Sequence, residues 1–367
     1  MKRRMKNGST RSFVRNPFAG RARKWADACR RTAFTVSVAL LFLGPANAGG
    51  AEWPEEVTVV SPAPGTSVHS LLTLMGKLVV KHTPINRWDV QPLGGPEVWL
   101  PMMKEERCQF ANHAVPDMIR AYQGLGVYER IGATPVRKVA AGHSTMFMFW
   151  TTPDRQLDAI EDLRGKRVFV RYKTNPLFLE MAEAQLASAG LGLTDLGSVL
   201  PFSNLSVATK ALVEGMADAV LFPSVPEAVE EINRLTGECR FVPLTLQQSR
   251  YVAERLRGYA VEDVPARDPR VGNRTPVSNA LVYRNAMFGS PTLDPEVVYG
   301  VVKAIFDHPA EMRGAHPLAP FWTLDYRPVA LSVPYHEGAV RYFREKGLWT
   351  SAAQAHQERM ISRRRSN

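Results

Sequence analysis

Residues 165–190 read GKRVFVRYKTNPLFLEMAEAQLASAG and decide the fold class. The β-rich run Arg167–Arg171 is followed by a polar turn and then by apolar residues at helical spacing. This pattern predicts a strand and then a helix over Leu177–Ala189. Three residues fit the N-cap, the first turn and the left-handed end of that helix, namely Asn175, Pro176 and Gly190. Strand, loop and capped helix in this order are typical of βαβ units.

The same order recurs on both sides of this stretch. Downstream, strands are predicted over Val199–Phe202 and Ala217–Phe222, with a helix over Ser206–Glu214 between them. Upstream, the pattern predicts strands at 57–60, 88–93 and 108–111, and helices that begin near 67 and span 116–123. Such an alternation predicts an α/β protein with mixed, mostly parallel sheets.

The alternating pattern divides into two lobes joined by two crossings. The predicted crossings are Met146–Thr152 outward and Thr275–Tyr283 on the return. The first lobe would then comprise residues 49–146 and 276–350, and the second lobe residues 147–275. Two crossings form a hinge, and the loops at the carboxyl ends of parallel strands are the usual place for a ligand.

Charge is concentrated at the two ends of the chain. Residues 1–48 hold eleven Lys or Arg against one Asp, and residues 351–367 add a net +3, so 49–350 carry −2 out of the total of +11. The basic pI of the whole chain therefore does not indicate a nucleic-acid partner. The polar, basic segment 351–367 is expected to be a frayed tail.

The basic N-terminal segment is predicted to be an export signal. An uncharged apolar run, Thr32–Leu43, precedes Ala46-Asn47-Ala48, whose small residues suit a signal peptidase that cuts after Ala48. Twelve helical residues reach only about 18 Å, which is too short for a hydrocarbon core of about 30 Å. The mature chain is therefore expected in the periplasm and outside the membrane. Three alternatives remain open: an uncleaved membrane anchor, twin-arginine in place of Sec export, and a start at Met5 or later.

Signatures of catalysis and of metal binding are missing from the sequence. There is no G-x-S-x-G, Walker A, strand-linked G-x-G-x-x-G or H-E-x-x-H motif, and Gly142–Met146 (GHSTM) lacks the closing glycine of a nucleophile elbow. We therefore expect no enzyme, no cofactor and no metal. His336 and Glu337 are interpreted as the start of a helix, and Cys108 and Cys239 as free thiols in different lobes.

Three segments resemble one family in the right order. ALSVPYHEGAVRYFREKGLW at 330–349 resembles the segment H-P-G-A-x-R-Y-Y-x-E-x-G of the TAXI family of solute receptors for TRAP transporters. DLRGKRVFV at 162–170 and LVEGMADAVLFPSVPEAVEEI at 212–232 resemble its D-L-x-G-K-x-V and L-x-x-G-x-x-D-A-x-F stretches.

The resemblance implies a fold, a ligand class and a partner. The fold would be a two-lobed, type II periplasmic-binding-protein fold with a hinge. The ligand would be a small organic anion of the glutamate-like or dicarboxylate class. A monomeric, non-catalytic receptor would deliver it to the membrane subunits of a TRAP transporter.

The candidate ligand residues lie in predicted loops and strand ends. The glycine-rich loops of the TAXI family are replaced here, so recognition is expected to shift toward side chains, above all toward Arg171 at the end of its strand. A surface arginine paired with an acid is the alternative for Arg171. The full set of candidates is Gly65, Thr66, Ser67, Gly94, Gly95, Asn112, His113, Arg171, Tyr172, Thr174, Asn175, Phe202 and Ser224, of which Tyr172 and Phe202 would form an apolar wall.

Two other functions stay open at this level. A periplasmic enzyme on the same two-lobed fold would need a base beside a nucleophile, and His113 with Asp117 is the pair that the sequence offers. A receptor that presents its solute to a sensor would have the same sequence features as one that serves a permease.

Overall fold

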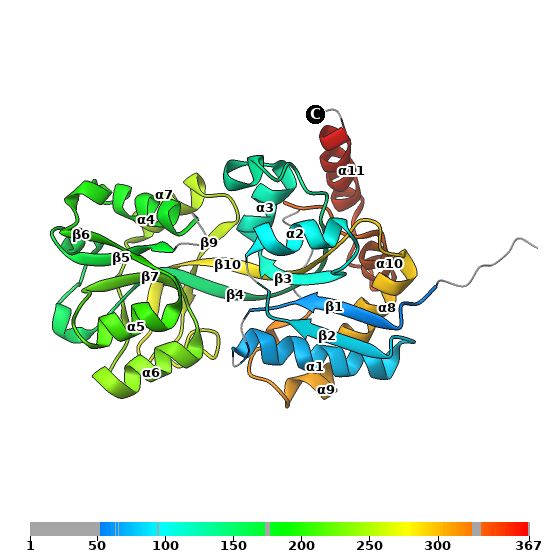
Figure 1. Cartoon of the computed structure of the whole chain (residues 1–367), viewed down its shortest axis with the longest axis horizontal. Helices are drawn as coiled ribbons and strands as arrows, with labels where there is room; N and C mark the ends of the chain where they lie inside the picture. The colour runs from blue at the N-terminus through cyan, green and yellow to red at the C-terminus, as the bar shows by residue number, and fades with distance from the viewer. Residues whose placement is uncertain are drawn as a thin grey trace, which may run out of the picture. The chain divides into compact units, whose positions relative to one another are not determined.

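The computed structural model describes residues 52–62, 64, 66–93, 95–172, 177–324 and 332–365 (Figure 1). The predicted export signal lies outside these residues. Within them, no helix is both long enough and apolar enough to cross a membrane.

The first lobe begins with three parallel strands. The central strand β1 (Glu56–Val60) pairs with β2 (Arg87–Gln91) on one side and with β3 (Phe110–Ala114) on the other. Its helices are α1 (Ser67–His82), α2 (Pro96–Lys104) and α3 (Val115–Gln123). Sequence reasoning missed α2, whose interior contains Pro101, a residue that normally ends a helix.

The second lobe repeats this plan. Strand β5 (Arg167–Tyr172) pairs in parallel with β6 (Ser198–Phe202) and with β7 (Ala219–Pro223). Its helices are α4 (Leu177–Ala187), α5 (Leu205–Val213), α6 (Pro226–Thr236) and α7 (Leu246–Arg255). Gly190 has φ of 68°, the left-handed value that its predicted place after α4 requires, whereas Asn175 and Pro176 lie outside the described residues.

Two long strands connect the lobes. Strands β4 (Arg137–Thr151) and β10 (Val277–Gly289) pair antiparallel with each other, and the strand order is β2-β1-β3-β10-β4-β7-β5-β6. Short strands β8 (Arg240–Phe241) and β9 (Tyr259–Val264) pair with β4 and β10, respectively. Figure 1 shows β4 and β10 running together from one group of elements into the other. The predicted α/β class with mixed sheets is thus confirmed.

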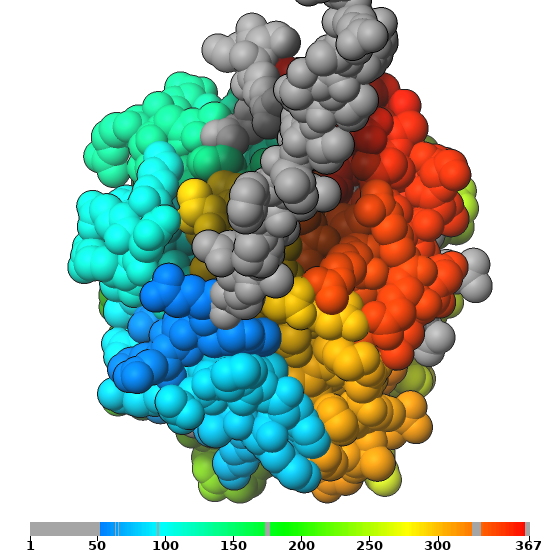
Figure 2. Space-filling view, turned by 90° about the vertical axis from the view of Figure 1, so that its right-hand side faces the viewer, coloured from blue at the N-terminus to red at the C-terminus, as the bar shows by residue number. Residues whose placement is uncertain are grey.

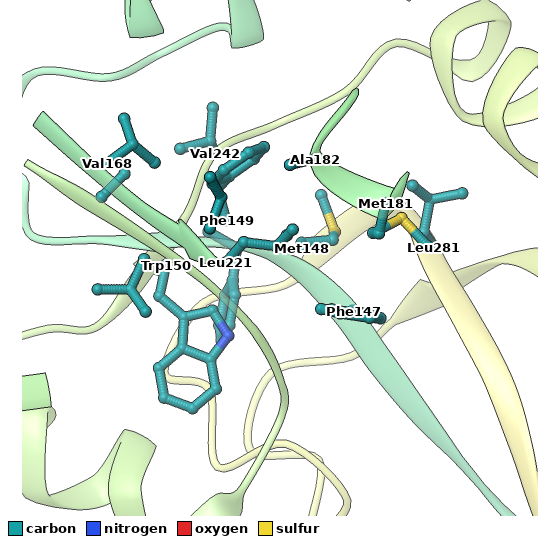
Figure 3. Close-up of a cluster of buried hydrophobic side chains, with 14 of the residues drawn as sticks. Phe147, Met148, Phe149, Trp150, Val168, Met181, Ala182, Leu221, Val242 and Leu281 are labelled. Carbon is teal, nitrogen blue, oxygen red and sulfur yellow. The ribbon is translucent and has the colours of Figure 1, made fainter. Parts of the chain in front are cut away.

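The hydrophobic core divides at these long strands. One cluster of buried side chains is drawn only from residues between Met146 and Val282. It contains the run Phe147–Trp150 of β4, which Figure 3 shows packed among side chains of the second lobe. Two further clusters lie in the first lobe. Each draws its buried side chains both from residues 57–140 and from residues 286–343. Cys108 and Cys239 are buried free thiols in different clusters.

The chain returns to the first lobe after β10. Asp294 caps α8 (Pro295–Phe306), and the chain continues through α9 (Pro309–Arg313) to α10 (Glu337–Glu345) and α11 (Ser351–Arg365). One-turn helices stand at η1 (Gly126–Glu129), η2 (Pro153–Arg155), η3 (Ile160–Leu163), η4 (Leu193–Asp195) and η5 (Ala319–Phe321).

The prediction of a frayed tail is wrong for residues 351–365. This segment forms α11, and Gln357 is buried there because its side-chain oxygen accepts a hydrogen bond of 2.8 Å from the backbone N–H of Tyr335. Met360 packs against the core of the first lobe. Contacts such as these hold a helix whose composition alone indicates a solvated tail.

Candidate ligand-binding site

A cavity of about 310 Å³ lies where the two lobes meet. The first lobe contributes side chains from the ends of β1 and β3 and from the start of α1 and α3, and the second lobe contributes the ends of β5 and β7. The long strands β4 and β10 supply the residues between them. A cavity of this size holds a small metabolite and falls at the lower end of the range for small-molecule sites.

Aromatic rings form one wall of the cavity. Phe178 of α4 lies with its ring centroid 4.9 Å from those of Phe147 and Tyr172, and 5.1 Å from that of Phe222. Tyr259 and Tyr283 also line the cavity, and burial raises the pKa of both phenols, so they remain neutral hydrogen-bonding groups. The wall suits the apolar body of a ligand.

A buried polar cluster lies on the long strands. Trp322 Nε1, which can only donate, lies 3.1 Å from His143 Nδ1. Burial, and secondly the charge of Arg270, lowers the pKa of His143 to about 3, so the ring is neutral. Its single proton is therefore on Nε2, which acts as a donor toward Asn285.

This proton position fixes the orientation of the Asn285 amide. The atom placed as Nδ2 lies 3.2 Å from His143 Nε2 and 2.6 Å from Thr145 Oγ1. Facing a ring N–H, that atom must accept, and 2.6 Å is the usual length of an O–H···O rather than an N–H···O hydrogen bond. We therefore assign it as the amide oxygen, which leaves the NH₂ group of Asn285 as a donor on the other side of the amide.

Arg270 supplies the positive charge among the lining residues. Asp268 accepts from its Nε at 2.9 Å and from its Nη2 at 2.6 Å, and Nη1 donates to Ser144 and, at 3.3 Å, to Glu262. These carboxylates and the bonds to them raise the pKa of Arg270 further above its ordinary value. The guanidinium is thereby fixed in one position and stays charged at any physiological pH.

An acid–base pair lies on the first-lobe side. His113 Nε2 is 2.7 Å from Asp117 Oδ2, and Tyr128 donates to Asp117 Oδ1 at 3.2 Å. The Asp117 side chain is only 3% exposed, so the histidine and the phenol replace the water that a carboxylate requires.

Two polar contacts join helices of one lobe to helices of the other. Arg120 of α3 donates to both carboxylate oxygens of Glu180 of α4, with Nη1 to Oε1 at 2.6 Å. Ser67 of α1 donates to Glu227 of α6. In this structure the lobes are therefore held together through side chains as well as through β4 and β10.

The family model described as the NMT1-like family matches residues 63–347, which is most of the chain and both lobes. The chain belongs to the NMT1-like family. The three resembling segments quoted above all lie within or at the end of the matched region.

Solved structures similar to this NMT1-like protein include XAC2383 from Xanthomonas citri bound to ATP, with 11% identity, a TM-score of 0.48 and coverage of 84% of this chain and 99% of that chain. A TctC solute binding protein from Polaromonas has 14% identity and a TM-score of 0.45, with 85% and 100% of the two chains covered. The alkanesulfonate-binding protein SsuA from Xanthomonas axonopodis pv. citri bound to MOPS has 15% identity and a TM-score of 0.42, with 84% and 85% covered.

The cavity of the NMT1-like protein brings together part of the predicted set. The predicted residues that line it are Thr66, Ser67, Asn112, His113, Tyr172 and Ser224. Asn112 is 4% exposed, and its Oδ1 has no hydrogen-bond partner in the part of the chain that is described, whereas Ser224 accepts from the N–H of Met146 at 3.2 Å.

The other predicted residues lie elsewhere. Arg171 is exposed and is not among the lining residues. Phe202 is buried in the second-lobe core, 5.1 Å from the Tyr172 ring, and Gly95 caps α2. The predicted candidates Gly65, Gly94, Thr174 and Asn175 lie outside the described residues.

Sequence reasoning missed the buried polar cluster and Arg270. A signal for the cluster was present, since GHST at 142–145 interrupts an otherwise apolar strand. Gly142 is required there because a Cβ would lie 2.0 Å from the Trp322 ring that bonds to His143. Arg270 had no such signal, because it lies in the irregular stretch between β9 and β10.

Proposed function

We propose that this NMT1-like protein is an exported solute-binding protein that captures a small organic anion between its lobes. The observation that supports this most directly is the cavity itself, built by both lobes and lined by Arg270, by the Asn285 amide and by an aromatic wall. The anionic group of the ligand would lie toward Arg270 and the NH₂ of Asn285, and its body would pack on Phe147, Phe178 and Phe222.

The finer part of the proposal rests on the sequence. The segments at 162–170, 212–232 and 330–349 resemble the TAXI family, so the ligand would be glutamate-like or a dicarboxylate and the partner a TRAP-type permease. The predicted export signal at 1–48 supports a periplasmic location for the mature protein, and the family resemblance supports a monomer. A sensor in place of the permease is the alternative partner.

An isosteric substitution tests the sign of the ligand charge. A panel of organic acids first identifies the carboxylate ligand that raises the melting temperature of the parent protein. Asn285→Asp replaces the amide NH₂ with a carboxylate oxygen, which repels that ligand. We expect the variant to bind it at least about tenfold more weakly than the parent does. Titration calorimetry measures the change. Asn86→Asp on the exposed surface is the matched control and should leave affinity unchanged. Equal or tighter binding of the anion by Asn285→Asp refutes the proposed anion site.

The contact between Arg120 and Glu180 is expected to favour the closed arrangement of the lobes. Glu180→Gln removes the charge but keeps the size, so apparent ligand affinity is expected to fall a few-fold while the melting temperature without ligand changes little, because Glu180 is 40% exposed. Glu183→Gln, exposed on the same helix, is the control. Unchanged affinity in Glu180→Gln would show that the contact does not contribute to closure.

The pair formed by His113 and Asp117 favours a second candidate function, an enzyme on this fold. An imidazole that is hydrogen-bonded to a buried carboxylate has the arrangement of a general base. Incubating each ligand of the panel with the protein and following its consumption separates the two functions. A receptor returns the ligand unchanged, and consumption abolished by His113→Gln would establish the enzyme.

A further inference from the structure

A group of side chains that could bind a metal ion lies on the first lobe, outside the cavity lining. His82 is the last residue of α1, His308 stands at the N-cap position of α9, and Glu311 is in the first turn of α9. Figures 1 and 2 show α1 beside the segment that contains α8 and α9. Residues more than 200 positions apart therefore meet at one place.

The donor atoms of these side chains converge. His82 Nε2 is 3.1 Å from Glu311 Oε1, and His308 Nδ1 is 3.6 Å from the same oxygen. All three donor atoms lie within 4.8 Å of one another. In the part of the chain that is described, this is the one group of three His, Cys, Asp or Glu side chains that meets this distance.

The separations match those of ligands around a tetrahedral ion. Metal–nitrogen and metal–oxygen bonds of about 2.0–2.2 Å place neighbouring ligands of a tetrahedral zinc ion about 3.3–3.6 Å apart. The observed 3.6 Å lies at the upper end of that range and the observed 3.1 Å slightly below it. Two imidazoles and one carboxylate are also a donor set that Zn²⁺ accepts, with the fourth position left for water.

We propose that His82, His308 and Glu311 bind a divalent transition-metal ion of the Zn²⁺ class. The two imidazole rings are stacked, with centroids 3.5 Å apart and planes 6° apart, so both must turn to direct their lone pairs at one ion. Rotation about the bond to a histidine ring is soft, so this turn costs little.

One neighbouring charge opposes the ion. Lys81 Nζ is 2.7 Å from Glu311 Oε2, the carboxylate oxygen that does not face the histidines. The ammonium therefore leaves Oε1 available but repels a dication. The site is expected to bind in the micromolar range, and its affinity should increase when this ammonium is removed.

The ion would tie the end of α1 to the chain segment that leads to the cavity. After α9 that segment supplies Leu318 to the cavity lining and Trp322 to His143. Metal binding is thus expected to raise the melting temperature. This consequence does not depend on the nature of the solute.

Titration calorimetry of the tag-free protein with ZnCl₂ tests the proposal, and the visible absorption of bound Co²⁺ reports tetrahedral coordination. We expect one ion per chain, loss of binding in His82→Ala and in His308→Ala, and about five- to tenfold tighter binding in Lys81→Met. His356→Ala, exposed on α11, is the matched control.

Three results would overturn the proposal. The first is a dissociation constant for zinc above about 1 mM. The second is a heat of zinc binding in the double variant His82→Ala, His308→Ala that equals that of the parent protein. The third is weaker zinc binding by Lys81→Met than by the parent. Folding of each variant is checked by its far-UV spectrum and melting curve. Because the readout is zinc binding, failure here leaves the solute-binding proposal intact.

Discussion

Replacing Lys138 with Met is expected to raise the free energy of unfolding at pH 7 by about 2 kcal/mol. Lys138 lies on β4 and is only 4% exposed. Burial lowers the pKa of its ammonium to about 8, against 10.5 in the unfolded chain. No carboxylate pairs with it among the described residues; its ammonium lies 5.2 Å from the centre of the Tyr335 ring.

The sign of the effect follows from that shift. A lowered pKa means that the folded state disfavours the charged form. Below pH 8 the lysine is charged in both states, and the difference between its pKa of 10.5 in the unfolded chain and about 8 in the folded protein corresponds to about 3 kcal/mol that opposes folding. Methionine removes this cost and loses only the contact of the cation with the ring, which is worth about 1 kcal/mol. Above pH 10.5 both states hold neutral lysine, and the advantage of methionine disappears.

Urea denaturation at pH 7 and at pH 10.5 measures both parts of this prediction. Lys77→Met, exposed on α1, is the control and should change stability little. A Lys138→Met protein that is less stable than the parent at pH 7 would mean that the ammonium has a favourable partner in solution.

Local rules predicted the elements whose ends are marked by caps. The end of α4 at Gly190 follows from a residue type that permits a left-handed turn. The helix α11 could not be predicted in this way, because its position depends on Tyr335 and Gln357, which are distant in the sequence.

The candidate site was predictable where loops follow parallel strands and not where it is built by the long strands. Asn112, His113 and Ser224 were placed by their position after a strand, and they line the cavity. His143 and Asn285 meet only because β4 and β10 pair antiparallel, a pairing that no local pattern specifies. Arg171 illustrates the limit of the loop rule, since it is exposed near the end of its strand and does not line the cavity.

Acidification from pH 8 to pH 5 is expected to lower the free energy of unfolding by about 4 kcal/mol through two buried histidines. Burial, and secondly Arg270, His316 and Arg284, lowers the pKa of His143 to about 3. Burial, and secondly Arg137, lowers the pKa of His336 to about 4, although Asp294 and a hydrogen bond to the Leu293 carbonyl act in the opposite direction.

Both shifts have the same sign and the same pH window. The folded state keeps each ring neutral, while the unfolded chain takes up a proton near pH 6.5. The stability that depends on the neutral rings is complete above pH 6.5 and is lost as the pH falls toward 4 and 3. pH 5 lies about 1.5 pH units below the pKa of a histidine in the unfolded chain. At that pH each ring therefore contributes about 2 kcal/mol less to the free energy of unfolding than it does at pH 8.

His336→Asn isolates one of the two contributions. The ring Nδ1 of His336 accepts from the backbone N–H of Gly338 at the start of α10, and asparagine is a good N-cap that does not titrate. We expect the variant to lose about 2 kcal/mol less than the parent between pH 8 and pH 5, even if its stability at pH 8 is lower because the bond to Leu293 is gone. His356→Asn on the exposed face of α11 serves as the control. Urea midpoints at pH 8, 6.5 and 5 decide the matter, because an equal acid loss in His336→Asn and the parent would mean that this ring is already protonated, or reached by water, in the folded protein.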